Sequence, residues 1–129
     1  MARYGHLSEL DVEECRHLLR GRTVGRVGWT SSSGPQILPV TYTLAGDAIV
    51  FRVRPGSRLG ELAEATEVSF QVDDLDDETR TGWSVLVTGR SGPWTGAVGE
   101  EPQPWAPGER PLVIGIEPDV ITGRSVAAD

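Results

Sequence analysis

The sequence predicts a mainly β domain (α+β): an antiparallel barrel of six or seven strands with a short N-terminal helix and a central helix. Most of the chain consists of short segments in which apolar and polar residues alternate, which is the period of a half-buried strand. Turn residues separate these segments closely enough for hairpins. Only two segments carry apolar residues at helical spacing. Strands joined by hairpins, with few helices, indicate an antiparallel barrel with helical additions.

Length and composition limit what the chain can do. At 129 residues it is expected to form one domain, residues 1–129, with a hydrophobic core. A net charge of -7, with twelve arginines and no lysine, argues against nucleic acid or an anionic membrane as a partner. The single cysteine, Cys15, excludes an intramolecular disulfide and a cysteine-rich metal site. Because no apolar segment reaches the length of a membrane span or resembles a signal peptide, we expect a soluble, cytoplasmic protein.

The N-terminal helix is predicted from Leu7 to Leu19, with Ser8 as its cap. The residues expected to face the core are Val12, Cys15, Leu18 and Leu19. Cys15 is therefore interpreted as a small buried hydrophobe and not as a nucleophile. His6 and His17 have no neighbours at the spacing of a metal site or catalytic triad, so both are interpreted as surface residues.

The first strands are predicted over residues 23–29 and 38–44, with a turn of serines and glycine between them. Because Pro39 cannot donate a hydrogen bond to a neighbouring strand, the second of these strands is expected at a sheet edge or a kink. Gly46-Asp47 is a two-residue turn that predicts a hairpin to the next strand, beginning at Ile49.

The segment from Ile49 to Leu62 passes from this strand into the predicted central helix. Pro55-Gly56 ends the strand, and Ser57 is a suitable N-cap for a helix whose core face would carry Leu59, Leu62 and Ala63. Free amides at the start of a helix favour an anion, and arginine adds charge-assisted hydrogen bonds. Ser57 could therefore form an anion site with three arginines, Arg52, Arg54 and Arg58. The alternative is an ordinary capped helix beside solvated arginines.

Further strands are predicted over residues 68–72, 81–89, 112–117 and 119–126. The acidic residues 73–78 are interpreted as a solvated loop. Residues 91–111, rich in Gly and Pro and containing Trp94 and Trp105, are expected to form an ordered loop. No Walker loop, GxGxxG turn, acid–base dyad or metal-site pattern is recognisable.

Three segments together resemble the pyridoxamine 5'-phosphate oxidase-like family of FMN-binding split β-barrels, in its short actinobacterial-type form. They are Leu38–Tyr42, Phe51–Leu59 and Val72–Gly89, and the resemblance extends from Leu7 to Val126. It implies a homodimer that binds two FMN molecules in clefts between the subunits. The four tryptophans agree with this expectation, because Trp is favoured at protein interfaces.

The resemblance also implies which residues bind the cofactor. Arg52, Ser57 and Arg58, in the same turn as Gly56 and Leu59, would hold the flavin phosphate. A second group would lie along the isoalloxazine and the ribityl chain: Pro39, Val40 and Thr41. Trp83 and Ser84 would approach the flavin, from the partner subunit.

The expected function is that of a flavin-dependent oxidoreductase acting on a small molecule. Pyridoxamine phosphate oxidases proper are longer and carry a basic C-terminal segment, whereas Arg124 is the only cation near the end of this chain. The vitamin-B6 reaction is therefore not expected. Two alternatives stay open, a reductase that uses a deazaflavin coenzyme and a non-catalytic protein that binds flavin or haem. FMN is preferred because a compact cradle can satisfy its single phosphate, whereas the acidic chain would repel the long anionic tail of a deazaflavin coenzyme.

Overall fold

The computed structural model of this chain describes residues 6–97 and 108–127. In chain order the elements are β1 (His6–Leu10), α1 (Val12–Arg20), β2 (Val24–Ser31), β3 (Gly34–Thr41), β4 (Thr43–Ala45), β5 (Ala48–Val53), the 3-10 helix η1 (Leu59–Ala63), β6 (Glu67–Asp76), β7 (Thr81–Pro93) and β8 (Leu112–Ala127). The mainly β class with two helical elements is confirmed. Eight strands are present in the described part of the chain, where six or seven were predicted.

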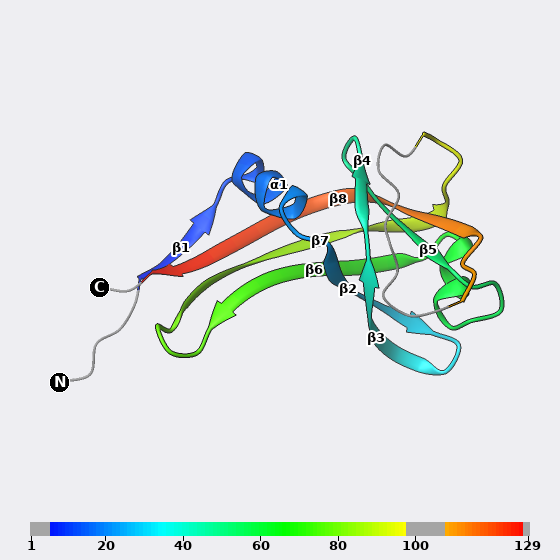
Figure 1. Ribbon diagram of the computed structural model, residues 1–129, viewed down its shortest axis with the longest axis horizontal. Coiled ribbons are helices and arrows are strands. Elements are labelled where there is room, and N and C mark those ends of the chain that lie inside the picture. The colour runs from blue at the N-terminus through cyan, green and yellow to red at the C-terminus, as the bar shows by residue number, and fades with distance from the viewer. Residues whose placement is uncertain (1–5, 98–107, 128–129) are drawn as a thin grey trace.

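All the strand pairs are antiparallel, and the strands lie in the order β3-β2-β6-β7-β8-β5-β4, with β1 added to β8. The two edge strands of this sheet, β3 and β4, are separated along the chain by one residue, Tyr42. The sheet must therefore curl until its two edges meet, which gives a half-open barrel (Figure 1). The predicted edge position of the strand that contains Pro39 is confirmed.

Tyr42 fixes the corner at which the two edges meet. Its backbone N–H donates to the carbonyl of Thr23 at 3.0 Å, and its hydroxyl donates to the carbonyl of Leu19 at 2.5 Å. The ring packs edge-on against Phe70, with centroids 4.9 Å apart. Burial raises the pKa of the Tyr42 hydroxyl, so this group stays a hydrogen-bond donor at neutral pH.

The core fills the inside of the curled sheet, with apolar side chains from every second residue of the long strands. On β2, for example, Val27 and Trp29 are buried while Arg26 and Thr30 are exposed. We call the opposite side of β3, β2, β6, β7 and β8 the outer face. The largest fully buried side chains include Phe51, Phe70, Ile49, Leu62, Ile114 and Ile116.

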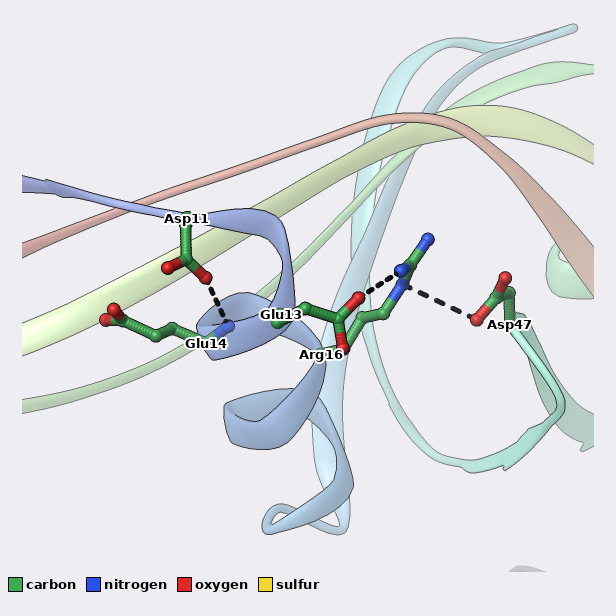
Figure 2. Close-up of polar contacts among 5 residues, drawn as sticks. All are labelled: Asp11, Glu13, Glu14, Arg16 and Asp47. Atoms are coloured by element: carbon green, nitrogen blue, oxygen red, sulfur yellow. Dashed lines mark hydrogen bonds and ion pairs between the residues drawn. The ribbon is translucent and has the colours of Figure 1, made fainter.

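The N-terminal segment differs from the prediction. His6–Leu10 is a strand paired with the end of β8, and α1 begins only at Val12. The cap is Asp11 and not Ser8, because the Asp11 side chain accepts a hydrogen bond of 2.8 Å from the N–H of Glu14 (Figure 2). Arg16 contacts Glu13 at 2.6 Å and Asp47 at 3.5 Å, and so ties α1 to the β4–β5 hairpin (Figure 2).

Two of the four residues predicted to face the core from α1, Cys15 and Leu19, are buried. Leu18 is half-buried and Val12 is exposed. The pKa of the Cys15 thiol is raised by burial and, to a smaller extent, by the charges of Asp11 and Glu14. A raised pKa disfavours the thiolate, which supports the interpretation of Cys15 as a packing residue.

The central helix is shorter than predicted. It is a single 3-10 segment of five residues, preceded by Arg58 at the cap position. Leu62 is buried, and Leu59 and Ala63 pack against the core, as the helical spacing predicted. Because so short a segment has almost no aligned dipole, the dipole part of the predicted anion site has no basis in the structure.

Four other boundaries also differ. The strand predicted over residues 38–44 is divided between β3 and β4, because the chain turns at Tyr42. The acidic residues 73–76 belong to β6, because they pair with residues 81–84 of β7, and only residues 77–80 form the turn. The predicted loop from residue 91 begins as the end of β7, and the part that contains Trp105 lies outside the described residues. The two predicted last strands form one continuous strand, β8.

A register shift at Pro118 allows β8 to continue past this proline. Gly89 pairs with Pro118 and Thr88 pairs with Val120, so Asp119 is the extra residue of a bulge. A Cβ atom at position 89 would lie 2.1 Å from the carbonyl oxygen of Glu117, so the bulge requires glycine here. Within residues 6–97 and 108–127, no helix is long and apolar enough to cross a membrane.

Candidate functional site

The turn after β5 carries the residues that the sequence indicated most directly. Gly56 has a φ of +80°, a left-handed conformation that favours glycine, and this reverses the chain. The N–H of Ser57 donates to the carbonyl of Arg54 at 3.1 Å. The Ser57 hydroxyl also donates to that carbonyl, and it accepts a hydrogen bond of 3.2 Å from the N–H of Gly60. Ser57 therefore holds the shape of the turn, although η1 begins two residues after it.

An open hollow of about 420 Å³ lies beside this turn. We call it the β5–η1 hollow, and its lining residues are Ser33, Gly56, Ser57, Arg58, Gly60 and Glu61. The turn between β2 and β3 forms its other wall through Ser33. The neighbouring Ser32 hydroxyl donates to the Glu61 carboxylate at 3.2 Å, so the two turns are linked directly.

The β5–η1 hollow offers several donors to an anion. Arg58 is exposed, and its guanidinium makes no hydrogen bond or ion pair with any residue in the described part of the chain. Within the same part of the chain, the backbone N–H groups of two lining residues, Gly56 and Arg58, have no hydrogen-bond acceptor. Arginine and free backbone amides in one open turn fit a phosphate group.

Two of the predicted arginines do not line the β5–η1 hollow. Arg52 lies within β5, opposite Val113 of β8, and its half-buried side chain points away from the core side of the strand. Arg54 follows the end of β5, and its guanidinium lies against Gly108. Leu59 packs against the core. Contact of Arg52 or Leu59 with a cofactor therefore stays a prediction.

The second predicted group lies on the edge strand β3. Val40 is buried in the core, whereas Pro39 is exposed and Thr41 half-buried on the outer face. Ser33 of the β5–η1 hollow lies just before β3, six residues from Pro39, or at most about 20 Å along the strand. One elongated ligand could therefore reach from the hollow along this edge.

Trp83 and Ser84 lie far from the β5–η1 hollow. Ser84 pairs with Arg124 on β8, while Arg52 pairs with Val113 on the same strand. These two positions of β8 are eleven residues apart, which corresponds to about 36 Å of strand. Figure 1 shows β8 crossing the whole length of the molecule between these ends. One subunit therefore cannot bring Ser84 and Arg58 to the same small ligand.

Trp83 and Ser84 also point to opposite sides of β7. Ser84 lies on the outer face, as Pro39 and Thr41 do. Trp83 packs beside α1, near Leu10 and Leu18.

The sequence did not identify Ser33 or Glu61 as site residues. The position of Glu61 could have been inferred, because residues three apart in a 3-10 helix lie on one side, and Arg58 precedes Glu61 by three. The position of Ser33 could not have been inferred, because it depends on the contact between two turns that are distant in sequence.

Comparisons with known proteins agree with this architecture. Residues 11–125 match the model of the pyridoxamine 5'-phosphate oxidase family. An uncharacterised protein of Mycobacterium tuberculosis, Rv0080, is 33% identical over 135 residues, which cover 94% of this chain and 86% of that protein.

Two solved structures of Mycobacterium smegmatis proteins are also similar. The FAD binding protein has a TM-score of 0.73 and 28% identity, with 93% of this chain and 98% of that chain covered. The FAD and heme binding protein has a TM-score of 0.69 and 15% identity, with 95% and 75% covered, so it supports the fold alone. The split-barrel architecture and the match over residues 11–125 lead to one conclusion: this chain belongs to the pyridoxamine 5'-phosphate oxidase family.

Proposed function

We propose that this protein is a flavin-dependent oxidoreductase that acts on a small molecule as a homodimer. In this proposal the phosphate of FMN lies in the β5–η1 hollow. The observation that carries it is the position of Arg58, an arginine without a partner in the described part of the chain, beside open backbone amides. Family membership and the similar FAD binding protein support a flavin as the ligand.

Each part of the site would have a separate task. The guanidinium of Arg58 offers a planar pair of donors to phosphate oxygens, and Ser57 keeps the turn open by bonding within it. Within the part of the chain that the structure describes, the edge strand β3 pairs with β2 on one side only. Part of its backbone is therefore available to a ligand near Pro39 and Thr41. When bound, a flavin supplies the hydride chemistry, and the protein supplies position and electrostatics.

The proposed dimer would use the outer face. Four large apolar side chains are exposed there: Ile37 at 72%, Leu75 at 67%, Val120 at 55% and Leu86 at 39%. Ile37 and Val120 belong to one row of cross-strand neighbours, Ile37, Gly28, Ser69, Thr88 and Val120. Part of this row also lines an open hollow of about 830 Å³. Exposed apolar residues in one continuous face are typical of an interaction surface.

A second copy of the chain is the proposed occupant of the outer face. Ser84 and Arg58 can contribute to one site only if they come from different subunits, because about 36 Å of strand separates their regions. Ser84 of one subunit, on the outer face, would then approach the flavin held by the other, as the family resemblance implies. Trp83 points to the other side of β7, so its contact with the flavin stays a prediction.

The visible absorption spectrum of the purified protein, followed by titration of the apo-protein, tests the choice of ligand. We expect flavin absorbance and saturable binding of FMN. A haem Soret band with no flavin binding would support a haem-binding function instead. A deazaflavin coenzyme that binds at least ten times more tightly than FMN would overturn FMN as the cofactor.

A further inference from the structure

A carboxylate shares the β5–η1 hollow with the proposed phosphate-binding groups. Glu61 lines the hollow together with Arg58 and Ser57, and its carboxylate accepts a hydrogen bond of 3.2 Å from the Ser32 hydroxyl. A negative charge is unexpected in a site for an anion, because it repels the ligand that the arginine attracts.

Arg58 does not neutralise this carboxylate. The two residues are three apart at the start of a 3-10 helix, a spacing that brings side chains to the same side. Yet the ion pairs among residues 6–97 and 108–127 do not include one between them. The hydrogen bond from Ser32 explains this, because it holds the Glu61 carboxylate toward the β2–β3 turn. Arg58 is therefore left to the ligand.

The charge of the phosphate decides how strongly Glu61 acts on it. At pH 7 a phosphate monoester such as FMN carries a charge between about -1.5 and -2, because its second pKa is near 6. Each phosphate inside a diester or pyrophosphate linkage carries a single charge. The pyrophosphate of FAD carries two such phosphates, but only the one in the hollow would lie beside Glu61, and the other would lie outside, where solvent screens its repulsion. Coulomb repulsion is proportional to charge, so the same carboxylate opposes the monoester up to about twice as strongly.

We propose that Glu61 is a specificity-determining residue. It weakens the binding of a terminal phosphate, as in FMN, more than that of a phosphate esterified on both sides, and so lowers the ratio of FMN affinity to the affinity for flavins of the second kind. This inference rests on the proposed function, since it assumes that a flavin phosphate enters the β5–η1 hollow. The hollow is open to solvent, so the chain of an esterified phosphate can continue outward from it. FAD is the accessible ligand of this kind.

The test compares three ligands on three proteins. Dissociation constants of FMN, FAD and riboflavin are measured on the wild type, on Glu61→Gln and on Glu64→Gln. Glu64 is an exposed carboxylate directly after η1 that does not line the hollow, so it is a matched control. Glu61→Gln keeps the size and the acceptor oxygen of the side chain but removes its charge.

We expect Glu61→Gln to tighten FMN binding about three- to tenfold and FAD binding by about two- to threefold, so that the ratio of FMN to FAD affinity rises. Riboflavin, which has no phosphate, should bind all three proteins equally, and Glu64→Gln should behave as the wild type. An unchanged ratio, or an equal change for riboflavin, would overturn the role of Glu61 alone. If none of the three flavins binds the wild type, the proposed function itself is wrong.

Discussion

The substitution Arg58→Ala removes the one guanidinium that, among the described residues, lines the β5–η1 hollow. A hydrogen bond to a charged group contributes about 1.5–3 kcal/mol. Arg58 is exposed, so solvent screening places its contribution at the lower end of that range, and the expected loss of FMN affinity is about tenfold. Screening also predicts that the loss becomes smaller as the salt concentration rises.

Fluorescence titration of the apo-protein with FMN and riboflavin measures this effect. Riboflavin lacks the phosphate, so its affinity should be the same for the wild type and for Arg58→Ala. The control is Arg20→Ala, which removes an exposed arginine from the last turn of α1 and leaves the hollow intact. An unchanged FMN affinity in Arg58→Ala, or an equal loss for riboflavin, would show that the phosphate does not lie at Arg58.

Three further predictions concern the fold. Gly25→Ala should lower the free energy of unfolding by about 1–3 kcal/mol, because its Cβ would lie 2.2 Å from the buried ring of Phe70. Gly28→Ala, whose Cβ would have ordinary contacts at 3.6 Å, should be tolerated in the same thermal melts. Asp11→Ala should cost about 1 kcal/mol through loss of the helix cap, whereas Ser8→Ala should cost nothing; equal effects would contradict the assigned cap. Tyr42→Phe should be less stable than the wild type near neutral pH, and denaturant titrations should show that this difference becomes smaller above about pH 10. Burial raises the pKa of the Tyr42 hydroxyl in the folded state. The stabilisation by this hydroxyl is therefore complete below the unfolded-state pKa and is lost as pH rises.

Local patterns were sufficient to predict the hairpins and the edge strand. The alternation from Ile49 to Val53 and the turn at Gly46-Asp47 correspond to a real hairpin, in which Ala45 faces Ala48. The inability of Pro39 to donate a hydrogen bond predicted a sheet edge or a kink for its strand, and the structure has it at an edge. These features depend on residues close in sequence, which is why the sequence alone indicates them.

The errors occurred where distant partners decide the local structure. His6–Leu10 has apolar spacing that also suits a helix, but pairing with the end of β8 makes it a strand. The acidic residues 73–76 have loop composition, yet their pairing with residues 81–84 extends β6. Pro118 is a strand breaker by itself, and only the bulge opposite Gly89 keeps β8 continuous.

The candidate site was predictable in part for the same reason. Gly56, Ser57 and Arg58 are neighbours in sequence, and the structure places all three around one hollow. Ser33 joins them from a turn more than twenty residues earlier, which no local pattern indicates. The separation of Ser84 from this hollow became visible only when the pairing along β8 was known.

The central claim, a flavin site shared between two copies of the chain, is tested most directly by size-exclusion chromatography with light scattering and flavin absorbance recorded on the same peak. The FMN-saturated protein should elute with the mass of two 13.9 kDa chains and one flavin per chain. A species with the mass of one chain that carries bound FMN would contradict the shared site.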